Sequence, residues 1–319
     1  MQHIRRYGTL IGFIAIVLFF SIMLPGTFPT ARNWLNITQQ VSMLMVVAAG
    51  MTIVMTMGDF DLSVGSTASL AGIVAALMMA AGMPVSTAVL GALAIGLLGG
   101  VVNGVMVSFV GILPFIATLA TMTMFSGLAF VVSGGKTISG RAIPEDFGTF
   151  ARGGIPLGEW GGVAISLPNL SIIAILVVFA VWVLLEQTTF GRRLYAIGGN
   201  MEAAHLGGIP VKRLRTIAFA LTGFAAAVGG IMYASRVASA NPVQGSGLML
   251  NAIAAVFLGS TMSRHGEPRI LATVVGVLVL GVLDNGLTQM SVDSYIRQIL
   301  VGALILLAVG LGSLSKARR

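Results

Sequence analysis

The chain has 319 residues, of which 56% are hydrophobic and only 9% are charged, with 42 glycines and no cysteine. A soluble domain carries about 25% charged residues, so the composition excludes a soluble protein and indicates a polytopic membrane protein without disulfides or cysteine-ligated metals. The formal charge of +8 does not predict nucleic-acid binding, because basic residues gather at the ends of membrane helices.

Apolar stretches that approach the length of a membrane span recur along the chain. A helix needs about 20 apolar residues to cross the hydrocarbon core. The ten candidates are Tyr7–Leu24, Val41–Met57, Val64–Ala81, Val85–Val110, Leu113–Ser133, Leu170–Leu185, Thr216–Ser235, Leu248–Met262, Ile270–Met290 and Tyr295–Leu314. We therefore expect an all-α fold of about ten transmembrane helices in a single transmembrane domain, residues 1–319.

Lysine and arginine predict the orientation of these helices. Most of the 18 basic residues lie at the N-terminus, in residues 186–215, between residues 264 and 269, and in the C-terminal tail. If the four basic segments are cytoplasmic and the chain crosses the membrane ten times, both termini lie in the cytoplasm. The loop at about 134–169, rich in glycine and proline, is then external, and the basic loop at about 186–215 is cytoplasmic.

The run Gly58-Asp59-Phe60-Asp61-Leu62-Ser63 interrupts an otherwise uncharged apolar stretch. Carboxylates at membrane depth are costly unless they are paired or hydrated, so they mark functional candidates. Three interpretations stay open: Asp61 or Ser63 caps the next helix while Asp59 faces water, a broken helix lines a polar pathway, or the carboxylates couple ions to transport. The run carries no basic residue, so it either reaches the cytoplasm or dips into the membrane.

Motifs for covalent chemistry are incomplete. Gly134-Gly135-Lys136-Thr137 lacks the upstream glycine of a phosphate loop, where Phe130 stands instead, so we expect an external turn and no ATP site. The three histidines lie in expected loops. Asp59-x-Asp61 offers too few oxygen ligands for a hard cation. We expect no enzymatic activity, no cofactor and no metal on this chain.

Polar and small residues predict contacts between helices. Gly96, Gly100 and Gly104 recur at every fourth position, which favours close helix packing. Asn103 lies in the same helix and can bond to a neighbour. Asp284-Asn285 forms another polar pair, for which structural bonding is the favoured role.

The basic loop contains a short predicted helix. Glu202-Ala203-Ala204-His205-Leu206 is preceded by Asn200 as an N-cap and followed by Gly207-Gly208 as a stop. A short surface helix between membrane spans suits docking into a partner's groove. The alternative is a basic loop that lies on anionic membrane lipid.

Several motifs together resemble one family. They are Gly58-x-x-Asp61-Leu62-Ser63-Val64-Gly65, Asn103-Gly104, Pro114-Phe115-Ile116-Ala117-Thr118-Leu119-Ala120-Thr121, Thr189-Phe190-Gly191-Arg192, Ala196-Ile197-Gly198-Gly199-Asn200 and Ala252-Ile253-Ala254-Ala255-Val256. In order and spacing they resemble the membrane permeases of bacterial ABC sugar importers of the ribose, xylose, arabinose and galactoside type. Met249, Asn251 and residues 263–269 depart from the family pattern.

The resemblance implies a multi-pass permease of the bacterial inner membrane, with partners. A second permease subunit, in a homodimer, would complete the pore. A cytoplasmic ATPase would bind ATP and Mg, and a periplasmic sugar-binding protein would deliver a monosaccharide of unspecified identity. The implied ATPase-coupling residues are Gly191, Arg192, Gly199, Asn200, Glu202, Ala203, Ala204 and Gly208. The expected pathway residues are Asp59, Phe60, Asp61, Ser63 and Asn103. The alternative function is an ion-coupled secondary transporter.

Overall fold

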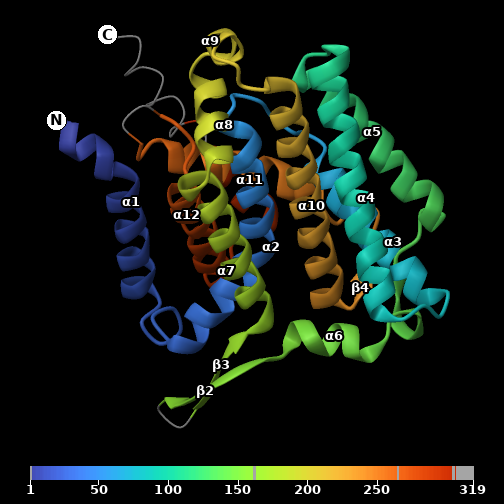
Figure 1. Cartoon of the computed structure of the whole chain (residues 1–319). Coiled ribbons are helices and arrows are strands. Elements are labelled where there is room, and N and C mark those ends of the chain that lie inside the picture. The colour runs from blue at the N-terminus through green and yellow to red at the C-terminus, as the bar shows by residue number, and fades with distance from the viewer. Residues whose placement is uncertain (1, 161–162, 264–265, 304–305, 307–319) are drawn as a thin grey trace.

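The computed structural model describes residues 2–160, 163–263, 266–303 and 306, and most of them are helical (Figure 1). The helices are α1 (Gln2–Met23), α2 (Ala31–Met55), α3 (Val64–Ala80), α4 (Val85–Val105), α5 (Pro114–Ser133), α6 (Glu145–Arg152), α7 (Asn169–Trp182), α8 (Thr189–Gly199), α9 (Met201–Leu206), α10 (Val211–Val237), α11 (Ser246–Ser260) and α12 (Ile270–Gln289). π-Helical turns continue α4 through Met106–Val110 and α7 through Val183–Gln187.

The bundle has two distinct ends (Figure 1). We call one end the α9 face; it carries the start of α1, together with α8 and α9. We call the opposite end the hairpin face; it carries α6 and an antiparallel hairpin of β2 (Gly154–Trp160) and β3 (Val163–Pro168). A second, two-residue pair joins β1 (Ile138–Ser139) to β4 (Ser239–Ala240).

Six of the described helices are long and apolar enough to cross a membrane, and three shorter apolar helices accompany them at Gly8–Met23, Val64–Ala80 and Ser246–Ser260. These helices correspond to the first nine predicted spans. The tenth, Tyr295–Leu314, continues into residues outside the described part of the chain. The coarse prediction of a polytopic helical protein is therefore confirmed, while the number ten stays a prediction.

The second span begins ten residues before the predicted start at Val41, because α2 begins at Ala31. Thr30 caps it: the Thr30 side chain accepts a hydrogen bond from the backbone N–H of Asn33 at 3.2 Å. A capped polar turn is a favourable helix start, but a search for about 20 consecutive apolar residues does not detect polar turns. The helical turns that this search missed line a cavity.

Glycines hold α4 tightly against α10. A Cβ added at Gly96 would lie 2.4 Å from the Cβ of Ala227, and one at Gly100 would lie 2.2 Å from the carbonyl oxygen of Phe219. At Gly104 it would lie 2.6 Å from the Cα of Thr216. Only glycine permits so close an approach of the two backbones. The predicted helix contact is confirmed.

The loop at 134–169 contains more regular structure than expected. Gly134 and Gly135, with φ of 60° and 71°, end α5 in a turn, as predicted for that motif. Beyond it the chain forms α6 and the β2–β3 hairpin rather than an irregular loop. Phe147 and Ala151 of α6 are buried against the bundle, which fixes this segment across the hairpin face.

Candidate functional site

The chain reverses between α2 and α3 in a segment, Thr56–Ser63, that we call the break. Gly58 adopts φ of +82°, a left-handed conformation that favours glycine, where α2 has ended. Asp59, Asp61 and Ser63 are nevertheless buried, with exposed fractions of 5%, 1% and 1%. Buried carboxylates require partners, and each has them.

Asp59 pairs with Arg215 of α10, which lies 156 residues further along the chain. The Arg215 Nε donates to Oδ2 of Asp59 and Nη2 donates to Oδ1, both at 2.8 Å. Only 6% of the Asp59 side chain and 13% of the Arg215 side chain are exposed. Two parallel charge-assisted bonds make a strong, directional contact. The interpretation that Asp59 faces water is therefore wrong.

Asp61 belongs to a second, separate network. Its Oδ1 accepts hydrogen bonds from the backbone N–H of Ser63 at 2.9 Å and from the Ser63 hydroxyl at 2.6 Å. The Asn103 side chain of α4 donates to the Ser63 Oγ at 2.8 Å and approaches Asp61 Oδ1 at 3.3 Å. Thr121 of α5 donates to the Asn103 Oδ1 at 2.6 Å. The network thus joins the break to two helices.

The capping interpretation is wrong for Ser63, whereas Asp61 makes a cap-like contact with the N–H two residues ahead. Ser63 occupies the N-cap position of α3, but its side chain accepts no bond from an α3 amide. Asp61 binds the N–H of Ser63 itself, one position before the helix begins. Half-buried Phe60, between the two carboxylates, packs on Phe257 of α11 with ring centroids 5.8 Å apart. The break is therefore fixed by side chains from α4, α5, α10 and α11.

We predict that Asn103→Ala lowers the free energy of unfolding by about 1–3 kcal/mol, because it leaves the buried Ser63 and Thr121 hydroxyls short of a partner. Asn36→Ala is the control, since Asn36 is an exposed α2 residue. Denaturant unfolding of the two purified variants in detergent measures the difference. Equal stability of both variants would contradict a structural role for the network.

The segment α8–α9, residues 189–206, lies on the α9 face (Figure 1). The Asn200 side chain accepts from the backbone N–H of Ala203 at 2.9 Å, and Gly208 adopts φ of +80° after the helix. The predicted N-cap, short helix and glycine stop are thereby confirmed. Leu206 at the end of α9 is 81% exposed, whereas Ala204 is buried.

The predicted coupling residues divide between anchors and surface. Gly191 and Ala204 are buried, and the exposed set is Arg192, Gly199, Asn200, Glu202, Ala203 and Gly208. A surface helix that is fixed to the bundle along one side buries the residues on that side and exposes the others, as seen here.

The α8–α9 segment, residues 189–206, which we call the coupling segment, packs directly on the break. A Cβ added at Gly198 of α8 would lie 2.0 Å from the carbonyl oxygen of Thr56. On the same helix, the Tyr195 hydroxyl donates to the carbonyl of Pro268 at 3.0 Å. Burial, with the nearby carboxylate of Glu186, raises the pKa of Tyr195, so its hydroxyl stays protonated and donates. The two regions that the sequence singled out are therefore neighbours.

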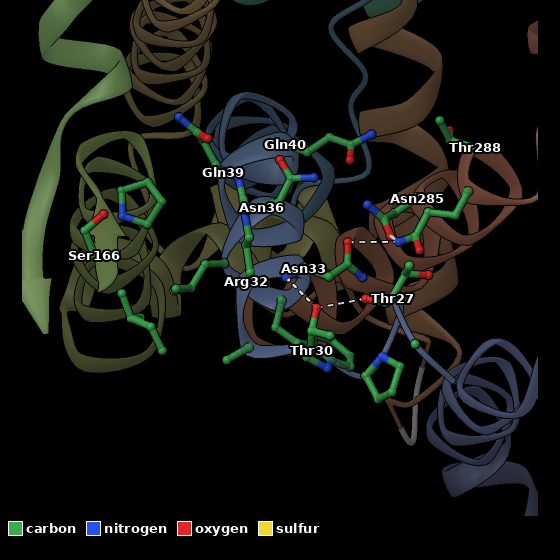
Figure 2. A pocket seen from close by; sticks show the side chains of 18 residues that line it. Thr27, Thr30, Arg32, Asn33, Asn36, Gln39, Gln40, Ser166, Asn285 and Thr288 are labelled. Carbon is green, nitrogen blue, oxygen red and sulfur yellow. Dashed lines mark hydrogen bonds between the residues drawn. The ribbon is translucent and has the colours of Figure 1, made fainter. Parts of the chain in front are cut away.

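A cavity of about 1530 Å³ opens on the hairpin face between the first turns of α2, the end of α12 and β3. Figure 2 labels ten of its polar lining residues, Thr27, Thr30, Arg32, Asn33, Asn36, Gln39, Gln40, Ser166, Asn285 and Thr288, and Gln289 also lines it. The expected pathway residues in the break do not line this cavity. Sequence reasoning missed it, although Asn33, Asn36 and Gln40 recur at helical spacing and could have indicated a polar helix face.

The fold and these sites define a class, a polytopic membrane permease with a surface helix fixed to a buried polar break. Residues 33–309 match the family described as "Branched-chain amino acid transport system / permease component", and the chain belongs to that family. It is 39% identical to the ribose import permease protein RbsC of Bacillus subtilis (strain 168) over 96% of this chain and 92% of that protein. It is 32% identical to the xylose transport system permease protein XylH of Escherichia coli (strain K12), over 99% and 93% of the two chains.

A solved structure shares the fold. An inward-facing conformation of a putative metal-chelate type ABC transporter aligns with a TM-score of 0.53 at 14% identity, covering 94% of this chain and 98% of that one. Membership of a permease family makes the chain a multi-pass membrane subunit of the bacterial inner membrane, and a pore component rather than an enzyme.

Proposed function

We propose that the chain is the permease subunit of an ATP-driven importer that moves a neutral monosaccharide across the inner membrane. Nearly full-length similarity to the ribose and xylose permeases carries this proposal. The family description names amino acids instead, so the substrate class is the point that experiments have to test.

In the proposed topology the chain has ten spans and both termini are cytoplasmic. The α9 face is then cytoplasmic, in keeping with the basic residues on either side of α9. The hairpin face lies outside and meets the periplasmic sugar-binding protein. Apolar α4, α5 and α7 are only 22–28% buried within one chain, which leaves surface for lipid and for a second permease subunit in a homodimer.

The coupling segment meets the cytoplasmic ATPase, which holds ATP and Mg. Leu206 provides an exposed apolar contact, and the close approach of Gly198 to Thr56 transmits movement of α8 to the break. The Asp59–Arg215 pair then carries that movement to α10. A pathway role for Asp59, Phe60, Asp61, Ser63 and Asn103 stays a prediction; the contacts described above support a role in holding the break beside α8.

Ion coupling is the alternative function, and the carboxylates argue against it. Asp59 is paired with Arg215, and Asp284 is paired with Arg297 at 2.7 Å. A coupling ion would have to displace an arginine from either carboxylate. Uptake into proteoliposomes that contain the permease, its ATPase and its binding protein is expected to require ATP and to be insensitive to proton or sodium gradients. Gradient-driven uptake by the permease alone would overturn the proposal.

We predict that Leu206→Asp abolishes co-purification of the ATPase and ATP-driven uptake, because a charge replaces the exposed apolar contact at the end of α9. Its unfolding transition is expected to match that of the unaltered chain, since Leu206 is 81% exposed. Leu206→Met keeps an apolar side chain and is the matched control. Retention of the ATPase by Leu206→Asp would contradict the assignment of α9.

A further inference from the structure

We propose that the cavity on the hairpin face is a binding site for a neutral, polyhydroxylated ligand, a monosaccharide, on the permease itself. The inference rests on the proposed import function and gives it an entry site. It concerns residues 26–40, β3 and the last turn of α12, which are separate from the break and the coupling segment.

The lining has the chemistry of a sugar site. Most of its polar side chains are amides and hydroxyls from α2 and α12 (Figure 2). Amides and hydroxyls both donate and accept hydrogen bonds, as each sugar hydroxyl does. Trp34 adds an aromatic surface and is itself held edge-on against Phe28, with ring centroids 6.0 Å apart. Such amphipathic aromatic rings suit a ligand with apolar C–H faces and polar edges.

The charges of the lining disfavour a zwitterionic amino acid. Among the described residues, no carboxylate lines the cavity, and Arg32 is its one ionisable side chain. The neighbouring Asp284 is already bound by the Gln40 Nε2 at 2.8 Å and by Arg297 at 2.7 Å. An amino acid carries both an ammonium and a carboxylate, and its ammonium would find no free counter-charge here. Arg32 is exposed, so water can meet its charge, and the amides and hydroxyls that make up most of the polar lining suit a neutral ligand.

Part of the lining is held in position and part is free to bind. The Gln289 Nε2 donates to the Oδ1 of Asn33 at 3.0 Å and to the Oδ1 of Asn285 at 2.8 Å. These bonds orient three amides across the gap between α2 and α12. By contrast, Asn36 also lines the cavity and is exposed, so its amide can reach a ligand.

The cavity is larger than a monosaccharide needs. A cavity of about 1530 Å³ exceeds the roughly 300–1,000 Å³ of a typical small-molecule site. A monosaccharide therefore enters with part of its water, as a transient site in a transport path requires. We expect weak binding, because tight binding would oppose onward release.

Trp34 provides a direct readout. A full-length permease with Trp160→Phe and Trp182→Phe keeps Trp34 as its only tryptophan, since the chain has three. Titration with ribose, xylose or allose, without ATP or binding protein, is expected to give a saturable fluorescence change, whereas leucine gives none. Asn36→Leu is expected to weaken sugar affinity roughly tenfold by removing one ligand hydrogen bond, and Asn36→Gln to restore it.

Two outcomes overturn the site: no saturable response to any of the three sugars, or equal affinity in Asn36→Leu and the unaltered chain. ATP-driven uptake at limiting sugar is measured in parallel for the complete transporter, with Asn36→Leu to remove the ligand bond and Thr149→Leu as a control on α6 of the same face. Unchanged uptake by Asn36→Leu overturns the site and leaves the import function standing. Absence of sugar uptake by the unaltered transporter overturns the function.

Discussion

Replacing Asp59 with alanine is expected to lower the free energy of unfolding by about 3–5 kcal/mol, because it leaves the buried Arg215 guanidinium without its counter-charge. Both side chains are largely buried and joined by two 2.8 Å hydrogen bonds. This loss of stability measures the cost of leaving one buried charge unpaired. It does not measure the net contribution of the ion pair to stability. Chemical denaturation of the purified permease in detergent measures it.

The double variant Asp59→Leu/Arg215→Met separates the two effects. Replacing both charges with apolar side chains of similar volume is often nearly neutral, so most of the lost stability is expected to return. In the complete transporter, this variant is expected to hydrolyse ATP while moving less sugar, because the link between the break and α10 is gone. A single-site loss below about 1 kcal/mol, the range of exposed pairs, would contradict the burial of this pair.

Gly100→Ala is expected to destabilise the permease by about 1–3 kcal/mol or more, since the added methyl group overpacks the contact between α4 and α10. The new Cβ would lie 2.2 Å from the Phe219 carbonyl oxygen and 2.8 Å from the Cα of Ala220. Both are backbone atoms, which cannot rotate away as a flexible side chain could. Relief therefore requires the two helices to separate.

Gly127→Ala in α5 is the matched control. A Cβ at Gly127 meets nothing within 4 Å, so alanine there is expected to be neutral or to stabilise the helix by about 0.5–1 kcal/mol. Thermal unfolding of the two variants side by side gives the comparison. Similar transitions for Gly100→Ala and Gly127→Ala would contradict the close packing of α4 on α10.

The sequence predicted features that depend on neighbours along the chain. The short α9 helix, with its Asn200 cap and glycine stop, is determined by residues adjacent in the sequence. The spacing of small residues in α4 is likewise visible within a single helix. The bonding of Asn103 to a neighbour was also expected. Features that depend on residues distant in the sequence were missed. The sequence indicated only that Arg215 lies in a basic loop, whereas the Arg215 side chain pairs with Asp59. Nothing in the local pattern of either residue identifies the other across 156 positions.

Hydropathy explains the remaining errors. A search for apolar length excludes Arg32 to Gln40, although α2 begins at Ala31, because amides lower the mean hydropathy without breaking a helix. The β2–β3 hairpin was missed for a related reason: proline and glycine predict turns, yet here they lie within a bulged pair, with Gly158 at φ of 118°. Both errors fall on the hairpin face, where the proposed sugar site lies.

Substrate competition tests the central claim most directly. Proteoliposomes containing the permease, its ATPase and its binding protein are given labelled ribose or labelled leucine with and without ATP. We expect ATP-dependent accumulation of ribose, inhibition of that uptake by xylose or allose, and no accumulation of leucine. Accumulation of leucine without any monosaccharide uptake would show that the chain is an amino-acid permease and would contradict the proposed function.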